Sequence, residues 1–217
     1  MSRYDFVIFD WDGTVMDSTG LIASCIQDAC RDEGIAVPSE EDARWVIGLG
    51  IAASMARIAP GITQDRQLAL ADRYRRHFLS REHEAPLFAG VREMLDDLRG
   101  RDRTLAVATG KARRGLERAF DSSGLRGHFD FSRCADEGHP KPHPDMVLWL
   151  LEQTGADPAR TVLIGDTTHD LELAANAGID AVGVCYGAHG GDTLRERPAR
   201  HYAGSVAELR QWLAANA

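Results

Sequence analysis

Two carboxylates stand two residues apart in the stretch FDWDGTVMDS, where the short apolar run 6–9 comes to its end. Side chains at positions i and i+2 of an extended chain point the same way, so Asp10 and Asp12 can serve one reaction. An aspartate has an ordinary pKa of about 3.9, so it is ionised at neutral pH and can attack phosphorus as a nucleophile. A second carboxyl beside it can protonate the leaving group and later activate water. The pair therefore indicates phosphoryl transfer.

Polar residues also follow two other apolar runs, 105–108 and 162–164, and a lysine lies between them in the sequence. If the runs are parallel strands, their carboxyl ends meet at one edge of the sheet. The cleft at that edge would contain these side chains: Asp10, Asp12, Thr109, Lys141, Asp166 and Asp170.

Four clustered carboxylates repel one another, and burying them costs several kcal/mol each unless something compensates. Oxygen ligands without a required His or Cys favour Mg²⁺ over zinc. Lys141 would give a positive charge to one phosphate oxygen, and Thr109 and the backbone amide of Gly110 could donate to others. Lys111 and Lys141 are the only lysines among 25 basic residues, which makes each of them a candidate for function.

The elements that must position these residues alternate along the chain. Continuous apolar runs indicate strands that are buried on both faces, at 6–9, 105–108, 162–164 and 181–184. Apolar residues at helical spacing, with Pro and Gly at the boundaries, predict helices at 91–99, 111–122, 144–154, 171–177 and 206–215. The alternation predicts an α/β fold with a doubly wound parallel sheet.

One segment breaks this alternation, because no strand-like run occurs between about residues 17 and 85. Four pieces of it have helical patterns, at 21–33, 40–47, 52–58 and 64–81. We therefore predict a catalytic core made of residues 1–16 and 86–217, and a helical cap made of residues 17–85. The cap would lie over the carboxyl ends of the strands, where α/β sheets bind ligands. Arg44 and the loop 48–50 are candidates for substrate contact from the cap.

The order of these motifs resembles the haloacid dehalogenase superfamily of phosphatases. The family pattern D-x-D-G-T-[LV]-x-D-S is matched by residues 10–18, and a Thr, a Lys and G-D-x-x-x-D follow in order at Thr109, Lys141 and 165–170. The helical insertion is similar to the cap that this family places after its first motif. The stretches VIGLG at 46–50 and KPHP at 141–144 resemble the phosphoglycolate phosphatase-like branch.

The resemblance implies a Mg²⁺-dependent phosphatase that acts through an aspartyl-phosphate, with 2-phosphoglycolate as the best single substrate. It implies that Asp10 is the nucleophile and Asp12 the general acid/base. Thr109, Gly110 and Lys141 would hold the phosphoryl group.

The resemblance also implies a set of metal ligands. These are the Asp10 carboxylate, the backbone carbonyl of Asp12, and Asp166, with Asp170 acting through water or by orienting Lys141. Many relatives have Asn where this chain has Gly110, so no role is carried over to the neighbouring Lys111.

Several alternatives stay open. A sugar phosphomutase, or a phosphatase for nucleotides, pyrophosphate or sugar phosphates, would use the same motifs. A receiver-like phospho-switch would gather similar residues, although the cap and Asp12 argue against it, and a catalytically idle relative is a further reading. Asp12 and Asp166 argue against a dehalogenase. The segment 17–85 holds no lysine for the Schiff base of a phosphonate-cleaving relative.

Composition bounds the partners of the protein. The 217 residues carry a net charge of −8, which argues against a nucleic-acid-binding surface. The four cysteines lack C-x-x-C spacing, the N-terminus lacks an apolar signal segment, and no apolar stretch reaches the roughly 20 residues of a membrane span. We expect a cytoplasmic monomer or homodimer that binds a small phosphorylated metabolite and no membrane.

Overall fold

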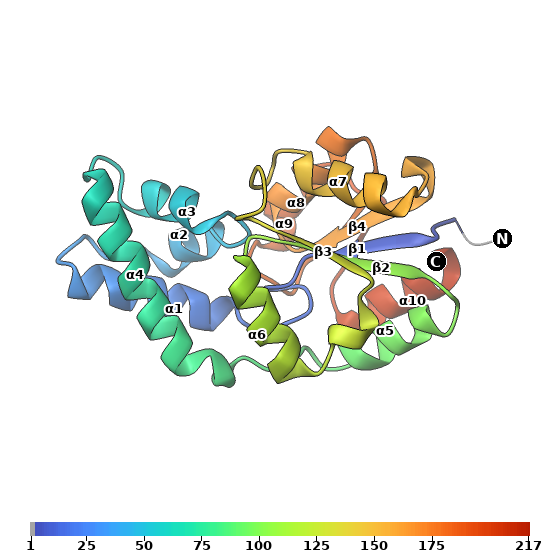
Figure 1. Cartoon of the computed structure of the whole chain (residues 1–217), viewed down its shortest axis with the longest axis horizontal. Coiled ribbons are helices and arrows are strands. Elements are labelled where there is room, and N and C mark those ends of the chain that lie inside the picture. Colours follow the sequence, from blue (N-terminus) through green and yellow to red (C-terminus); the bar gives the residue numbers. More distant parts are fainter. Residues whose placement is uncertain (1–2) are drawn as a thin grey trace.

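The computed structural model describes residues 3–217, and its centre is a six-stranded sheet (Figure 1). The strands are β1 (Phe6–Phe9), β2 (Thr104–Thr109), β3 (Phe131–Cys134), β4 (Thr161–Gly165), β5 (Asp180–Val184) and β6 (His201–Ala203). All neighbours are parallel, in the order β3-β2-β1-β4-β5-β6. The first two residues of the predicted core segment 1–16 lie outside the described residues.

Helices cover both faces of the sheet, which confirms the predicted doubly wound α/β fold (Figure 1). One face is packed by α5 (Val91–Arg99), α6 (Arg113–Ser123) and α10 (Val206–Asn216). The other face is packed by α7 (Asp145–Thr154), α8 (Thr168–Ala177) and the short α9 (Gly191–Arg195). Two 3₁₀ turns complete the core, η2 (Arg126–His128) and η3 (Pro158–Arg160).

The strand order changes direction beside β1. The chain runs outward from β1 through β2 to β3, and then returns to the other side of β1 as β4. Ligands in open α/β sheets bind at such a reversal, outside the carboxyl ends of the strands. Residues that follow β1, β2 and β4 are therefore placed for chemistry.

Residues 17–85, all of them described, form helices and no strand. The elements are α1 (Thr19–Asp32), α2 (Glu40–Trp45), α3 (Ile51–Ile58), α4 (Gln64–Arg81) and the 3₁₀ turn η1 (Glu82–Glu84). They enclose a hydrophobic cluster of their own, with members such as Ile26, Met55 and Leu70. We keep the name cap for residues 17–85, and the predicted boundaries of this unit stay a prediction.

The cap joins the core through two adjacent linkers. The amide of Asp17 donates to the carbonyl of Pro86 at 2.9 Å, and the amide of Phe88 donates to the carbonyl of Val15 at 3.2 Å. The two chain crossings between core and cap therefore lie side by side. Within the described residues, no helix is both long and apolar enough to cross a membrane.

Candidate active site

The structure brings the predicted site residues to one edge of the sheet. Asp10 follows β1, Thr109 ends β2, Asp166 follows β4, and Asp170 lies in the first turn of α8. Lys141 reaches the same place from the loop before α7. All five side chains are buried, with exposed fractions of 2 % or less. Residues that are up to 160 positions apart in the sequence thus share one water-poor cleft.

Lys141 links two of the acids. Its Nζ donates to Asp10 Oδ1 and to Asp170 Oδ1, both at 2.6 Å. The other oxygen of Asp170 accepts from the amide and the hydroxyl of Thr167, at 3.0 and 2.6 Å. Burial alone would lower the pKa of Lys141, but the two carboxylates raise it above its ordinary value, so the lysine stays charged. Asp170 is thereby fixed as a support for Lys141.

Asp166 is held by two donors and surrounded by glycines. Its Oδ1 accepts from the Thr14 hydroxyl at 3.0 Å, and its Oδ2 accepts from the amide of Ala188 at 2.6 Å. A Cβ on Gly13 would lie 2.1 Å from Asp166 Oδ2, and a Cβ on Gly187 would lie 2.2 Å from it. Gly13 also has a φ of +84°, which side chains rarely adopt. The two backbone segments can approach this carboxylate because neither carries a side chain there.

The acids form a group that a divalent cation would fit. One oxygen each of Asp10, Asp166 and Asp170 lies within 4.8 Å of the others. Asp10 Oδ2 is buried and has no hydrogen-bond partner among residues 3–217. Burial raises the pKa of Asp10 to about 7 against the opposing charge of Lys141, and burial with neighbouring carboxylates raises that of Asp166 well above its ordinary value. A bound cation would offset this repulsion, and an all-oxygen donor set suits Mg²⁺.

Asp12 stands apart from this group. Its Oδ1 accepts from the Ser18 hydroxyl at 2.6 Å and lies 3.0 Å from Lys111 Nζ. The same Nζ lies 4.8 Å from the ring centre of Phe78 in the cap. No role was predicted for Ser18, and Lys111 was a candidate for function only because lysine is rare in this chain. Both lysines of the chain lie in the site.

Thr109 and Gly110 occupy the place where the cap comes down on the core. Thr109 is buried, and its Oγ1 accepts from the amide of Lys111 at 3.1 Å. A Cβ on Gly110 would lie 2.5 Å from the carbonyl oxygen of Gly48 in the cap. The glycine therefore gives the cap loop its room, and the predicted donation of its amide to phosphate stays a prediction.

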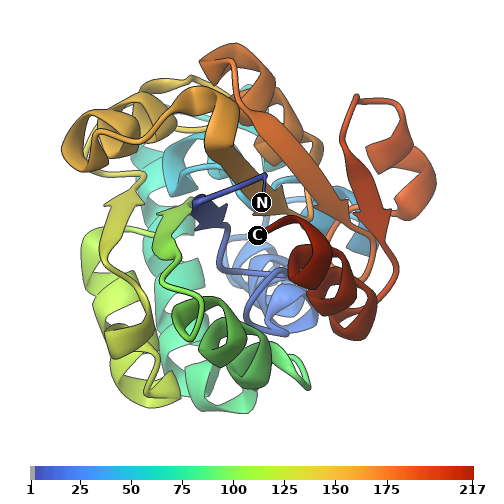
Figure 2. The same cartoon turned by 90° about the vertical axis from the view of Figure 1, so that its right-hand side faces the viewer.

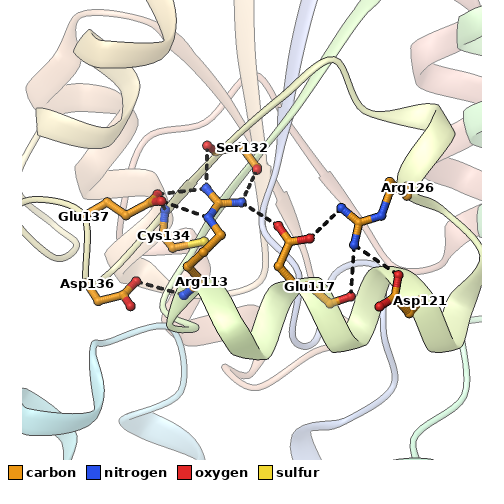
Figure 3. A network of polar contacts seen from close by, with 8 residues as sticks. All are labelled: Arg113, Glu117, Asp121, Arg126, Ser132, Cys134, Asp136 and Glu137. Atoms are coloured by element: carbon orange, nitrogen blue, oxygen red, sulfur yellow. Dashed lines mark hydrogen bonds and ion pairs between the residues drawn. The ribbon is translucent and has the colours of Figure 1, made fainter.

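A polar network surrounds Arg113 at the start of α6, a few residues after Gly110 (Figure 3). Arg113, the first residue of α6, pairs with both oxygens of Glu137 at 2.8 Å and donates to the hydroxyl and carbonyl of Ser132 at 2.7 and 2.9 Å. Its amide donates to Asp136 at 2.9 Å. These contacts tie the start of α6 to β3 and to the residues that follow it.

A second contact joins cap and core near Trp45. His169 Nε2 and His189 Nε2 both lie 3.0 Å from the carbonyl oxygen of Trp45. The amide of Thr168 donates to Nδ1 of His189, so the proton of this ring sits on Nε2 and points at Trp45. Burial lowers the pKa of both histidines and keeps them neutral.

Of the cap residues singled out in the sequence, one group lines the catalytic cavity and the other does not. Gly48–Gly50 border it together with Asp10 and Asp12. Arg44 instead donates to Glu40 and Thr19, both at 2.9 Å, and faces a smaller cavity. Arg44 does not line the cavity above Asp10, and its contact with substrate stays a prediction.

Comparison with known proteins decides the family. The family model described as haloacid dehalogenase-like hydrolase matches residues 7–184. The chain belongs to this family. The probable phosphatase IndB of Dickeya dadantii is 39 % identical over 196 residues, covering 87 % of this chain and 84 % of that protein. A 5'-nucleotidase of Pseudomonas aeruginosa is 31 % identical over 218 residues, covering 97 % and 96 %.

Solved structures confirm the fold. The crystal structure of a predicted phosphoglycolate phosphatase from Haemophilus somnus superposes with a TM-score of 0.86 at 22 % identity, covering 98 % of this chain and 99 % of that one. The two share an architecture, a core with a helical insertion. The family match and the phosphatase relatives make this haloacid dehalogenase-like protein a phosphatase.

Proposed function

We propose that this phosphatase is a Mg²⁺-dependent phosphomonoesterase that hydrolyses a small phosphorylated metabolite through an aspartyl-phosphate on Asp10. The state of the Asp10 carboxylate carries the proposal. One of its oxygens is held by Lys141 at 2.6 Å, and the other is buried without a hydrogen-bond partner among the described residues. Such a group at the floor of a cavity is free to react with an electrophile that enters it.

The two carboxylates divide the proton transfers. A carboxylate oxygen of Asp10 forms a bond to phosphorus as the ester P–O bond breaks, and Asp12 gives its proton to the departing alkoxide. Asp12 then takes a proton from water, whose oxygen bonds to phosphorus while the acyl-phosphate P–O bond breaks and frees Asp10. The side-chain contacts of Asp12 are with Ser18 and Lys111, which are different partners from those of Asp10.

The remaining site residues bind and orient. Asp10, Asp166 and the backbone carbonyl of Asp12 would hold Mg²⁺, which when bound neutralises the charge of the phosphoryl group. Lys141, Thr109 and the amide of Gly110 would hold phosphoryl oxygens. Asp170 keeps Lys141 aimed at Asp10 through its own 2.6 Å contact.

Phosphate release from a panel of esters, in Mg²⁺ and in EDTA, tests the proposal. The panel begins with 2-phosphoglycolate, which the sequence resemblance favours, and with nucleoside 5'-monophosphates, which the name of the Pseudomonas relative adds. It continues with sugar phosphates and pyrophosphate. We expect Mg²⁺-dependent release that disappears in Asp10→Asn.

Three results would contradict the proposal. Full activity of Asp10→Asn would show that Asp10 is not the nucleophile. An isomerised sugar phosphate without free phosphate would indicate a mutase, and a phospho-protein that persists without turnover would indicate a switch.

A further inference from the structure

A cavity of about 750 Å³ lies above Asp10 and Asp12, between the cap and the core. Pockets of ~300–1,000 Å³ are the usual size for drug-sized ligands. A two-carbon acid such as 2-phosphoglycolate would occupy a small part of it and leave the rest to water. The volume therefore points to a larger alcohol on the phosphate.

The cap side of this cavity is mostly apolar. Helix α1 contributes Ile22 and Ile26, α3 contributes Met55, and α4 contributes Tyr74 and Phe78. Displacing water from such a surface by an apolar group lowers the free energy of binding. The apolar wall thus selects for an apolar part of the substrate.

Tyr74 and Phe78 form an aromatic surface, which we call the ring platform. They lie one turn apart on α4 with ring centres 6.0 Å apart and planes inclined by 29°. Aromatic faces bind other flat rings by offset or edge contacts. Burial raises the pKa of the Tyr74 hydroxyl, so it keeps its proton and can donate to a polar atom of a ligand.

Most of the cations that line the cavity are already paired with carboxylates. Four basic residues line it, Arg75, Lys111, Arg114 and Arg118; Asp72 pairs with Arg75, and Asp12 engages Lys111 at 3.0 Å. Arg118, at the other side, pairs with Glu82 at 3.2 Å. A carboxylate next to the phosphate would compete with Asp12 for Lys111.

The ring platform is within reach of the reaction. Lys111 Nζ touches both Asp12 Oδ1, at 3.0 Å, and the Phe78 ring, whose centre is 4.8 Å away. A ring joined to the phosphate by a short linker can therefore rest on Phe78 while its ester oxygen faces Asp12.

We propose that the substrate is a phosphomonoester whose alcohol carries a flat ring, and that this ring packs on Tyr74 and Phe78. This inference rests on the proposed function, and it replaces 2-phosphoglycolate by a ring-bearing class. Aromatic and heterocyclic rings share the required chemistry, and the substrates tested distinguish them.

A matched pair of substrates isolates the ring. Ethyl phosphate and 2-phenylethyl phosphate have the same kind of leaving group, a primary alkoxide, and differ in the phenyl group. Burying an aromatic ring raises binding in the transition state, so we expect kcat/KM to be about 10- to 100-fold higher for the phenylethyl ester. Adenosine 5'-monophosphate tests a heterocycle on a sugar. Equal values for ethyl and phenylethyl phosphate would overturn the inference.

Variants on α4 tie the preference to the ring platform. Phe78→Ala should lower the phenylethyl-to-ethyl ratio of kcat/KM about tenfold, and Phe78→Tyr should keep it. Leu68→Ala, on the same helix but 58 % exposed and outside the cavity, is the matched control and should change neither value. An equal loss on both esters in folded Phe78→Ala, checked by its melting temperature, would show that Phe78 acts through Lys111 and would overturn the ring platform.

The same measurements distinguish a wrong substrate class from a wrong phosphatase mechanism. If 2-phosphoglycolate is hydrolysed faster than both ring-bearing esters and Asp10→Asn is inactive, the phosphatase mechanism stands and the ring class is wrong. If no ester is hydrolysed by the wild type, both fall together.

Discussion

Lys111 connects the cap to Asp12, the proposed general acid/base. Its Nζ contacts the Asp12 carboxylate at 3.0 Å and the Phe78 ring of the cap at 4.8 Å. Lys111 thus lies between a core carboxylate and a cap ring. Because Asp12 has Ser18 as its other side-chain partner, loss of Lys111 would leave the carboxylate free to rotate about one hydrogen bond.

We predict that Lys111→Met lowers kcat at least tenfold for alkyl phosphates. A positioned general acid contributes ~10²–10⁴-fold, and a misplaced one loses part of this. The loss should be smaller for p-nitrophenyl phosphate, because its leaving group departs without a proton. Steady-state kinetics on both esters provide the measurement, with Lys111→Arg as the charge-conserving control. An equal loss on both esters would mean that Lys111 serves structure alone.

Asp166 should stabilise the protein only with a cation bound. Burial and the charges of Asp10 and Asp170 raise its pKa, which means that folding without a cation makes its ionised form less favourable. Asn has the same shape, can accept from Ala188 and can donate to Thr14. We predict that Asp166→Asn raises the metal-free unfolding free energy, because the neutral amide avoids this repulsion.

Thermal unfolding in EDTA and in excess Mg²⁺ measures both sides of this prediction. At this chain length the metal-free melting temperature should rise by roughly 2–4 °C per kcal/mol, and the Mg²⁺-dependent rise of the wild type should vanish. Asp192→Asn, which removes a fully exposed carboxylate, is the control. A variant that keeps the Mg²⁺-dependent rise would exclude Asp166 as a metal ligand.

At the level of elements, the sequence predicted strands where both faces are buried. β1, β2, β4 and β5 are nearly continuous apolar runs, and the sequence marked all four. β3 and β6 were missed, since FSRC is only partly buried at its first three positions and HYA is three residues long. Both are edge strands of the sheet, where side chains are less buried and an apolar run is not required.

The same reasoning explains which part of the site was predictable. Residues that directly follow a strand converge through topology alone, so Asp10, Thr109 and Asp166 could be placed together from their order in the chain. The contacts of Lys111 with Phe78 and of Gly110 with Gly48 depend on how the cap folds back. No periodicity in the sequence encodes that distance, so these contacts appear only in three dimensions.

Gly110 is predicted to set how far the cap can close. A Cβ there would lie 2.5 Å from Gly48 O and 2.8 Å from Leu49 O, which are backbone atoms and cannot rotate away. Gly110→Ala should therefore hold the cap loop off the core and lower kcat/KM about 10- to 100-fold, as misplaced catalytic groups do. The melting temperature should change little.

Steady-state kinetics and thermal unfolding of the purified variant check this prediction. Gly127→Ala is the matched control, because nothing lies within 4 Å of its Cβ position and its φ is ordinary. Wild-type activity in Gly110→Ala would mean that the cap loop does not approach the core this closely during turnover.

At the scale of the whole molecule, the cap covers the cleft, so a substrate needs a way to enter it. Gly48 lies on Gly110, and Trp45 is held by two neutral histidines of the core, while the paired linkers at 15–17 and 86–88 are the covalent connection. Motion about the linkers would open the cavity as one unit, and closure would expel water and bring Phe78 to Lys111. On the proposed function, such a movement would couple substrate choice to the placement of Asp12.

The opposite end of the sheet has a stabilising role, and both termini lie there (Figure 2). The amides of Arg3 and Tyr4 donate to the carbonyl of Asn216 at 2.8 and 2.9 Å. Asp180, at the start of β5, accepts from Arg3, Tyr4 and Arg200 at 2.9, 2.8 and 2.7 Å. One carboxylate thus joins the N-terminal segment to β5 and to the loop before β6.

Asp180 gives the protein a pH-dependent stability that is independent of the active site. Burial opposes the effect, but hydrogen bonds from Arg200 and Tyr4 and the nearby arginine charges hold the pKa of Asp180 below its usual range. A lowered pKa in the folded state stabilises the protein above the unfolded-state pKa of about 3.9, and this stability is lost as pH falls through the folded-state value. Asp180→Asn should therefore be less stable than wild type at pH 7 by about 1 kcal/mol.

The difference between Asp180→Asn and wild type should shrink as pH falls below about 4, because the wild-type carboxyl then becomes protonated and neutral like the amide. Denaturant unfolding of both proteins in EDTA from pH 7 to pH 3 measures it, with Asp192→Asn showing the effect of removing an exposed charge. EDTA keeps both proteins metal-free, so that metal binding does not contribute to the difference in stability. A difference that stays constant across this range would show that Asp180 acts by packing, and that its charge does not hold the termini to the sheet.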